Sequence, residues 1–183
     1  SITILDWCQT HGVLYLDSSI EPWADKSEDS TIPLWARTQY FYHHTLRHLA
    51  KTRWQSDGPT AVVAHGANPG LVSHFVKAAL LDIARAMGLP HTFPTDQSGW
   101  ATLAQETGVK VIQISERDTQ ISSQPKKPDE FVNTWSIWGF LAEAYYPAEI
   151  GWGTHEKHLP DNAQRFEFGP GNAIYLQRPG GAT

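Results

Sequence analysis

The chain has 183 residues, of which 40% are hydrophobic and 18% are charged, a composition typical of a folded protein rather than a disordered one. Its net charge of −5 and the lack of Lys/Arg runs argue against nucleic acid and anionic membrane as partners. The single cysteine excludes an intrachain disulfide and a cysteine-rich zinc site. No apolar run approaches the roughly 20 residues that a membrane span requires, and we expect a cytoplasmic protein.

The first part of the chain predicts a helix at residues 2–9 and a strand at residues 13–16. This helix-to-strand order is typical of the interior of an α/β unit. A long helix is expected from Pro33 to about Trp54, because proline is favoured in the first helical turn. Residues 56–59, Ser-Asp-Gly-Pro, then end it.

A strand, a loop and a helix follow. Residues 61–64 form a short apolar run, and Gly66-Ala67-Asn68-Pro69-Gly70 is the loop, with Asn68 as the expected N-cap of the helix. Such a loop presents backbone N–H groups where ligands bind in α/β proteins. The chain has no G-x-G-x-x-G, however, and an ordinary N-cap is the local interpretation. The helix should end at Gly88. Its apolar side chains recur at helical spacing and predict one core face: Leu71, Val72, Phe75, Val76, Ala79, Leu80, Ile83 and Met87.

The second half predicts shorter elements separated by loops. We expect a helix from Ser98 to about Thr107, a short helix that Ser136 caps and Pro147 stops, and an exposed loop at residues 122–129. Strands are expected at residues 109–114, 131–135 and 172–177.

Several residues have side chains suited to binding a metal or a cation, but the local sequence does not show that they lie together. His43, His44 and His48 lie on the long helix, but no third ligand is evident, so we predict exposed histidines and no metal. Glu21 and Glu143 each have tryptophan nearby in sequence. An ammonium group gains about 0.5–2 kcal/mol over a tryptophan face, and a carboxylate holds the same charge. Each carboxylate also has an ordinary interpretation as a solvated side chain, and this applies equally to an ion-paired Glu116.

Six strings along the chain resemble one family, the bacterial NAD-dependent homospermidine synthases, which are relatives of the saccharopine dehydrogenases. They come in the family's order and with close to its spacing across almost the whole chain. The strings are Ser19-Ile20-Glu21-Pro22-Trp23, Gly66-Ala67-Asn68-Pro69-Gly70, Glu116-Arg117-Asp118-Thr119-Gln120, Phe131-Val132-Asn133-Thr134-Trp135-Ser136, Gly151-Trp152-Gly153-Thr154 and Pro160-Asp161-Asn162.

The resemblance implies an α/β fold in two parts. Residues 1–88 would be the C-terminal part of a Rossmann-type NAD domain. Residues 89–183 would be part of an α/β (α+β) substrate-binding, catalytic and dimerisation domain of saccharopine dehydrogenase-like type. The family's glycine-rich fingerprint would lie before Ser1 and one of its active-site histidines beyond Thr183. We therefore expect an internal segment that is inactive by itself.

The resemblance also implies a reaction and a cofactor. An aminobutyl group would pass from putrescine or spermidine to a second putrescine through imine intermediates, giving homospermidine and ammonia. NAD would take a hydride and return it, and the enzyme would be a homodimer. Asn68, Ser18 and Ser19 correspond to positions that contact the cofactor.

The substrate site is carried over in the same way. Glu21 and Glu116 correspond to carboxylates that hold and orient the reacting diamine, and Trp135 to the tryptophan that faces cationic intermediates. Glu143 corresponds to the outer carboxylate that anchors the distal ammonium group. These residue types suit a diamine, which carries two positive charges about four carbons apart.

Three alternatives stay open. A saccharopine-type dehydrogenase acts on an amino-acid imine, and its carboxylate-rich substrate requires arginines and lysines in the site. A non-catalytic amine- or sugar-binding module would present Trp135 on an open face, whereas the synthase predicts Trp135 in a cleft facing Glu116 and Glu143. A fragment that folds and does nothing by itself is the third.

Overall fold

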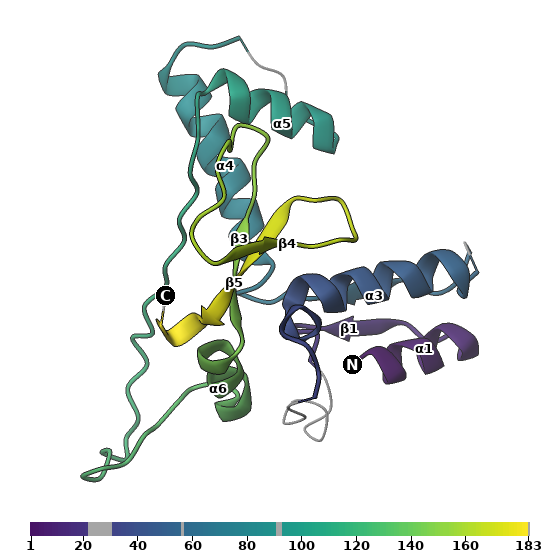
Figure 1. Ribbon diagram of the computed structural model, residues 1–183, viewed down its shortest axis with the longest axis vertical. Coiled ribbons are helices and arrows are strands. Elements are labelled where there is room, and N and C mark those ends of the chain that lie inside the picture. The colour runs from purple at the N-terminus through teal and green to yellow at the C-terminus, as the bar shows by residue number, and fades with distance from the viewer. Residues whose placement is uncertain (22–30, 56, 91–92, 183) are drawn as a thin grey trace. The chain divides into compact units, whose positions relative to one another are not determined.

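The computed structural model describes residues 1–21, 31–55, 57–90 and 93–182 (Figure 1). The chain forms two compact units. Unit 1 comprises Ser1–Leu14, Ile20–Pro59 and Arg117–Thr183, and unit 2 comprises Tyr15–Ser19 and Thr60–Glu116. The boundary that we predict between residues 88 and 89 stays a prediction.

In unit 1, the long helix predicted from Pro33 to Trp54 is confirmed only from Gln39 to Thr52, because the chain forms two separate elements there. The 3-10 helix η1 (Leu34–Arg37) is followed by α3 (Gln39–Thr52). Between them Thr38 is extended, at φ −97° and ψ 152°, and its Oγ1 accepts the N–H of Phe41. Thr38 is buried and also donates a hydrogen bond to the carbonyl of Trp35. A hydroxyl that caps a helix requires this break in the backbone.

The predicted helix at residues 2–9 is confirmed as α1 (Ile2–His11), which ends at Gly12 in the left-handed conformation with φ 71°. Glycine reaches this conformation without the steric cost that a Cβ brings. Leu5 and Cys8 form the buried face of α1. The buried Ile20 belongs to the same unit.

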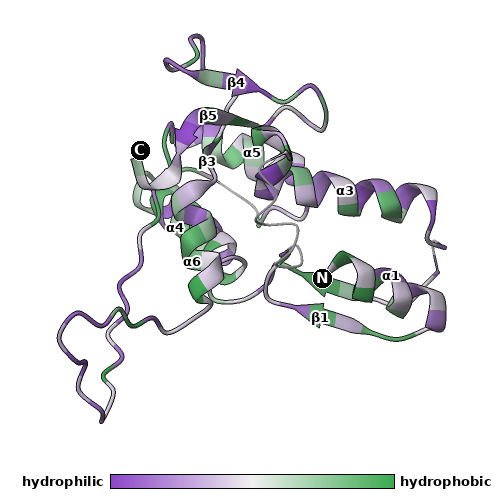
Figure 2. Ribbon diagram, turned by 60° about the horizontal axis from the view of Figure 1, so that its bottom comes forward, coloured by the Kyte–Doolittle hydropathy of each residue, from purple (hydrophilic) through white to green (hydrophobic). Residues whose placement is uncertain are grey.

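The C-terminal part of unit 1 is an antiparallel sheet with one helix before it. Helix α6 (Ile137–Tyr145) has the predicted cap, since Ser136 Oγ accepts the N–H of Gly139. Figure 2 shows mainly apolar and weakly polar residues along α6. The sheet has the order β3–β5–β4, and the 3-10 helix η2 (Gly180–Ala182) follows it. Its strands are β3 (Pro147–Gly151), β4 (Ala163–Arg165) and β5 (Ala173–Pro179).

Aromatic packing fixes α3 within unit 1. The ring of Tyr40 stacks on that of Phe166 at 4.2 Å between centroids. Its hydroxyl donates to the carbonyl of Phe168 and accepts the N–H of Gly171. Because Phe166, Phe168 and Gly171 lie in the connection from β4 to β5, the first turn of α3 is anchored to the sheet.

Unit 2 contains the predicted strand–loop–helix segment. Strand β1 (Tyr15–Asp17) pairs in parallel with β2 (Ala61–Val63), with Tyr15 opposite Ala61. Helix α4 (Leu71–Ala86) follows β2, and the predicted stop at Gly88 is confirmed by its φ of 65° and its N–H bonded to the carbonyl of Arg85. Together with the sheet and helices of unit 1, these elements confirm the predicted mixed α/β class.

The loop before α4 differs from the prediction, because Gly70 and not Asn68 is the N-cap. Gly70 has φ 117°, and a Cβ there would lie 2.7 Å from the Cα of His65. The N–H of Leu71 bonds to the carbonyl of Gly66, which turns the loop back on itself and delays the helix. Asn68 is therefore left on the loop with its side chain available for another partner.

The next helix, α5 (Gln97–Glu106), also begins earlier than predicted. Asp96 is its N-cap, not Ser98, because the extended Asp96 accepts the N–H of Gly99 at 2.7 Å. Leu103 of α5 packs on Leu80 and Ala84 of α4, and these three residues form the core of unit 2.

The predicted apolar face of α4 is only partly core. Leu80 is buried, but Phe75 is 64% exposed. The strands predicted at residues 109–114 and 131–135 do not form within the described residues, because strand propensity without a neighbouring strand does not fix a strand. The strand predicted at residues 172–177 is confirmed as β5. None of the helices in the described part of the chain is long and apolar enough to cross a membrane.

Candidate functional site

Unit 1 contains a pocket of about 470 Å³. Its lining comes from three stretches of chain: the residues from η1 into α3, the residues from Trp135 through α6, and the start of β3. Glu21 also lines it. Three of the residues predicted for the substrate site, Glu21, Trp135 and Glu143, therefore line one pocket.

The start of α6 positions Trp135. A Cβ at Gly139 would lie 2.5 Å from the Trp135 ring, so the ring packs directly over this glycine. Glu143 follows Gly139 by one helical turn and lies on the same face of α6. Trp135 remains 47% exposed, which leaves ring surface for a ligand.

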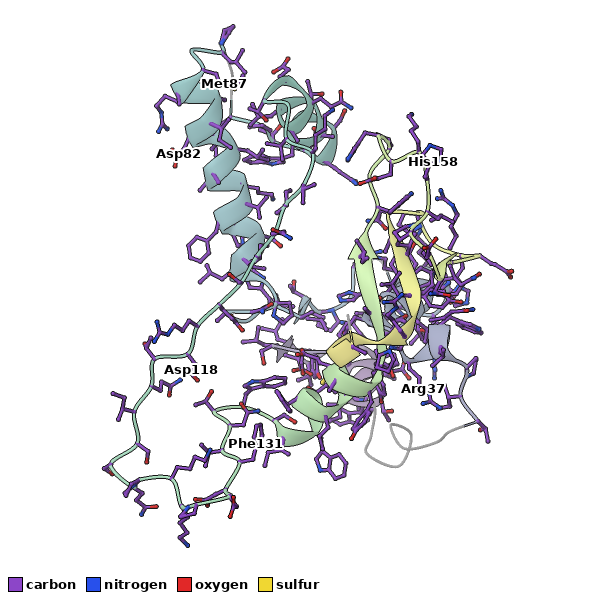
Figure 3. The ribbon with its side chains drawn as sticks, turned by 60° about the vertical axis from the view of Figure 1, so that its left-hand side comes forward. Arg37, Asp82, Met87, Asp118, Phe131 and His158 are labelled. Carbon is purple, nitrogen blue, oxygen red and sulfur yellow. The ribbon has the colours of Figure 1, made fainter. Side chains whose placement is uncertain are left out.

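A hydrogen bond fixes the loop that leads into Trp135. The hydroxyl of Thr134 donates to the carboxylate of Asp118, and this bond lowers the pKa of Asp118. Figure 3 shows Asp118 and Phe131 on the two arms of this long loop. The bond thus joins the two ends of the loop immediately before the pocket.

The lining of the pocket also includes Arg37, Gln39, Tyr42 and Glu149, which form the wall described next. The carboxylate of Glu149 accepts the N–H groups of Gln39 and Tyr40 at 2.8 and 2.9 Å. Although part of Glu149 is exposed, desolvation of its carboxylate raises the pKa, and the two N–H donors oppose this shift.

Tyr42 is a neutral phenol in this wall. Burial raises the pKa of Tyr42 to about 12, with the nearby Tyr146 and Glu149 acting in the same direction and Arg37 against them. Tyr42 therefore offers a hydroxyl that keeps its proton at any physiological pH.

The pocket is acidic and aromatic. Its described lining includes the carboxylates of Glu21, Glu143 and Glu149 and one guanidinium, that of Arg37. Arg37 donates from Nε to the carbonyl of Ile32 at 2.9 Å. Carboxylates beside tryptophan rings suit a positively charged ligand.

The other predicted site residues lie in unit 2. The Nδ2 group of Asn68 donates to Oε1 of Glu116 at 3.3 Å. Ser18 lies beside Gly66, since a Cβ on that glycine would be 3.1 Å from the Ser18 Cβ. Ser19 donates its N–H to the carboxylate of Asp17 at 3.0 Å.

Ser18 and Ser19 follow the end of β1, and Asn68 lies on the loop that follows β2. The carboxyl ends of parallel strands are where ligands bind in α/β sheets. Ser18 and Gly66 lie close together at this edge, and the predicted contact of Asn68, Ser18 and Ser19 with a cofactor stays a prediction. The lining of the unit 1 pocket does not include Glu116, so its predicted share in one diamine site stays a prediction.

Sequence reasoning missed four residues. Arg37, Tyr42 and Glu149 line the pocket, and Asp17 orders Ser19 and accepts a hydrogen bond from the Tyr15 hydroxyl. Glu149 is 110 positions from Gln39, and no local pattern signals such a contact. The Asp-Ser-Ser run after a predicted strand is a signal that would have found Asp17.

The histidines on α3 are less exposed than predicted. His44 lies 4.6 Å from the ring of Phe168, and burial lowers the pKa of His43, with Arg47 adding to the shift. His43 and His44 are half-buried, with His44 against the ring of Phe168, and His48 is the exposed one of the three. Among the residues that the structure describes, no three His, Cys, Asp or Glu side chains are grouped to hold a metal. The prediction of no metal stays a prediction.

Known proteins resemble the chain along its length. It is 46% identical over 183 residues to a homospermidine synthase of Blastochloris viridis, and 43% identical over 185 residues to one of Mesorhizobium japonicum. All of this chain is covered in both alignments, but the chain spans only 38% of the length of either relative.

The fold is also that of a solved structure. The crystal structure of the homospermidine synthase of Legionella pneumophila in complex with NAD matches with a TM-score of 0.74 and 43% identity. The match covers 98% of this chain and 36% of that one. The family model of the saccharopine dehydrogenase C-terminal domain matches residues 66–182, which is more than half of the chain. The chain therefore belongs to the family of saccharopine dehydrogenase C-terminal domains.

Proposed function

We propose that this chain forms the substrate-binding portion of an NAD-dependent homospermidine synthase. Its identity of 43–46% to the two curated synthases, along its entire length, supports this activity. The observation that carries the proposal is the pocket of unit 1, in which Glu21, Glu143 and the Trp135 ring lie around one cavity. The proposed substrates are putrescine, spermidine and related small polyamines.

The proposed net reaction joins two amines. The amine-bearing carbon of putrescine is oxidised to an imine, the amine of a second putrescine attacks it, ammonia leaves, and the new secondary imine is reduced to homospermidine. NAD, held by Asn68, Ser18 and Ser19, supplies a hydride acceptor for the oxidation and the hydride for the reduction. The reaction is therefore redox-neutral overall.

The side chains of the chain bind and orient the amines. Glu143 anchors the distal ammonium group, and Glu21 holds the reacting end of the diamine. The predicted role of Glu116 in orienting the diamine stays a prediction, because Glu116 does not line this pocket. A carboxylate forms charge-assisted hydrogen bonds with an ammonium group, which are roughly twice as strong as neutral ones. The face of Trp135 stabilises the cationic imines without offering a nucleophile.

The charges in the pocket favour this function over a saccharopine-type dehydrogenase. A substrate rich in carboxylates needs several arginines or lysines, whereas the described lining has three carboxylates and the single guanidinium of Arg37. We further propose a cytoplasmic homodimer, with neither nucleic acid nor membrane as a partner, and the net charge of −5 supports the last point.

The test uses the protein encoded by the complete gene, with labelled putrescine and NAD, and chromatography of the product. The wild type should form homospermidine, and Glu143→Gln should lower kcat/KM about 10- to 100-fold, the value of a lost charged hydrogen bond. Glu167→Gln, at an exposed position outside the pocket, is the matched control and should match the wild type. A wild type that makes no homospermidine, or a Glu143→Gln protein with normal kcat/KM, would refute the proposal.

A further inference from the structure

Glu149 of β3 and the first turn of α3 are joined across the chain by two hydrogen bonds. Oε2 accepts the N–H of Gln39 at 2.8 Å and Oε1 accepts that of Tyr40 at 2.9 Å. Each oxygen of the carboxylate has its own donor. Glu149, Gln39 and Tyr42 all line the pocket, so the contact lies in its wall.

The contact satisfies donors that a helix cannot satisfy by itself. The first N–H groups of an α-helix have no carbonyl partner within the helix, and they carry the positive end of its dipole. The hydroxyl of Thr38 accepts one of them, that of Phe41, and Glu149 accepts the two before it. A negative charge at this end of the helix stabilises the turn.

Glu149 therefore has a different task from the other carboxylates of the pocket. Both of its oxygens accept hydrogen bonds from α3, and its negative charge lies at the positive end of the helix dipole. The turn that it holds carries Gln39 at the first position of α3, and Tyr42 comes one turn later on the same helix. Movement of this turn would move both lining side chains together.

We propose that Glu149 is a positioning residue for the pocket. Through its hydrogen bonds to α3, Glu149 holds the side chains of Gln39 and Tyr42 in place beside the bound diamine. The identity of the ligand rests on the proposed function, whereas the action of Glu149 on α3 does not.

The first test is a double-mutant cycle in the protein encoded by the complete gene. Glu149→Gln presents an amide in place of one oxygen, which sets a donor against a backbone N–H. This loss of a charged hydrogen bond should raise KM for putrescine about tenfold while kcat stays within about twofold. Tyr42→Phe should raise KM about fivefold, the value of one neutral hydrogen bond.

The double variant distinguishes a shared wall from two separate effects. Because Glu149 acts through the wall that carries Tyr42, the increase in KM for the double variant should be clearly smaller than the product of the single increases. Glu149→Asp keeps the charge on a shorter side chain and should raise KM less than Glu149→Gln. Glu167→Gln should leave KM unchanged. Independent, multiplying effects of Glu149→Gln and Tyr42→Phe would overturn the proposal.

The second test needs no turnover. Amide hydrogen exchange at Gln39 and Tyr40 should accelerate about tenfold in Glu149→Gln, because the two N–H groups lose a charged acceptor. The exchange rate should be unchanged in Glu167→Gln. If Glu149→Gln fails to fold, exchange at Gln39 and Tyr40 is measured in Glu149→Asp instead and should also accelerate. Unchanged exchange in the Glu149 variant would overturn the proposal. A wild type that makes no homospermidine would refute the proposed function, and the exchange measurement would still decide the role of Glu149.

Discussion

The side-chain amide of Asn68 donates a hydrogen bond to the carboxylate of Glu116, with 3.3 Å between Nδ2 and Oε1. Asn68 lies on the loop between β2 and α4, and Glu116 is the last residue of unit 2. We propose that Asn68 contacts the cofactor and that Glu116 orients the diamine. The hydrogen bond therefore joins one residue of each proposed role and fixes one oxygen of the carboxylate.

This contact predicts an order of severity at position 68. Asn68→Ala removes the donor and should lower kcat/KM with putrescine about tenfold. Asn68→Asp sets a second carboxylate within hydrogen-bond distance of Glu116, where like charges repel and raise a pKa, and should lower kcat/KM further than the alanine does. Steady-state rates at about pH 8 measure both.

A matched control separates charge from position. Asn172→Asp adds the same charge at an exposed residue outside the pocket and should leave kcat/KM unchanged. An Asn68→Asp enzyme as active as Asn68→Ala would show that the two side chains do not interact during turnover.

The loop around Asn68 also shows what the sequence predicts well and where it stops. Short-range patterns located β2, α4 and the stop at Gly88, because hydrophobic period and glycine conformation act over a few residues. The predicted N-cap at Asn68 is wrong, because the choice between Asn68 and Gly70 depends on how close His65 lies in space. That distance is set by the tertiary structure, and no local sequence pattern encodes it.

Some residues of the pocket are also predictable from the sequence, and others are not. Trp135 lies just before α6 and Glu143 lies on α6, eight residues later. The resemblance of the strings predicts Glu21 at the same site. Glu149 escaped prediction because its partners, Gln39 and Tyr40, are more than a hundred residues away. Strand propensity at residues 109–114 failed for the related reason that pairing needs a neighbour that the segment itself does not contain.

The partly exposed ring of Trp135 predicts different effects for two substitutions at this position. A cation gains about 0.5–2 kcal/mol over a tryptophan face and less over phenylalanine. Trp135→Phe should therefore lower kcat only about threefold, whereas Trp135→Ala should lower it about tenfold or more. Single-turnover rates with putrescine and NAD measure this.

The control for Trp135 is Trp7→Ala, which removes another exposed tryptophan. Trp7 lies on α1, stacks on His11 and does not line the pocket, so its loss should leave the rate at the wild-type value. Equal rates for Trp135→Phe and Trp135→Ala would exclude a role for the π face.

Tyr42 predicts how stability changes at high pH. Its pKa is raised from 10.0 to about 12 by burial, so the folded state holds this proton more tightly than the unfolded state. The stability that it contributes is fully present below about pH 10 and is lost as the pH rises through about 12. The free energy of unfolding of the wild type should thus fall more steeply over this range than that of Tyr42→Phe.

Urea unfolding followed by tryptophan fluorescence at several pH values between about 9 and 12 gives this comparison. The difference between the two proteins cancels the titration of all other groups. Parallel pH dependences for wild type and Tyr42→Phe would contradict a proton held by burial at Tyr42.

Gly70 predicts a larger cost of substitution than another glycine with positive φ. Gly88 has φ 65° with open space at its Cβ position, so Gly88→Ala should cost about 1–2 kcal/mol from the left-handed backbone alone. At Gly70 the φ is 117°, and a Cβ would lie 2.7 Å from the Cα of His65 and 2.9 Å from the carbonyl oxygen of Gly66. These are backbone atoms, which cannot turn aside as a side chain can. Gly70→Ala should therefore lower the free energy of unfolding by more than about 3 kcal/mol, as measured by urea unfolding. Equal costs for Gly70→Ala and Gly88→Ala would contradict this prediction, because they would mean that the loop carrying Asn68 adjusts to the added Cβ at no further cost in stability.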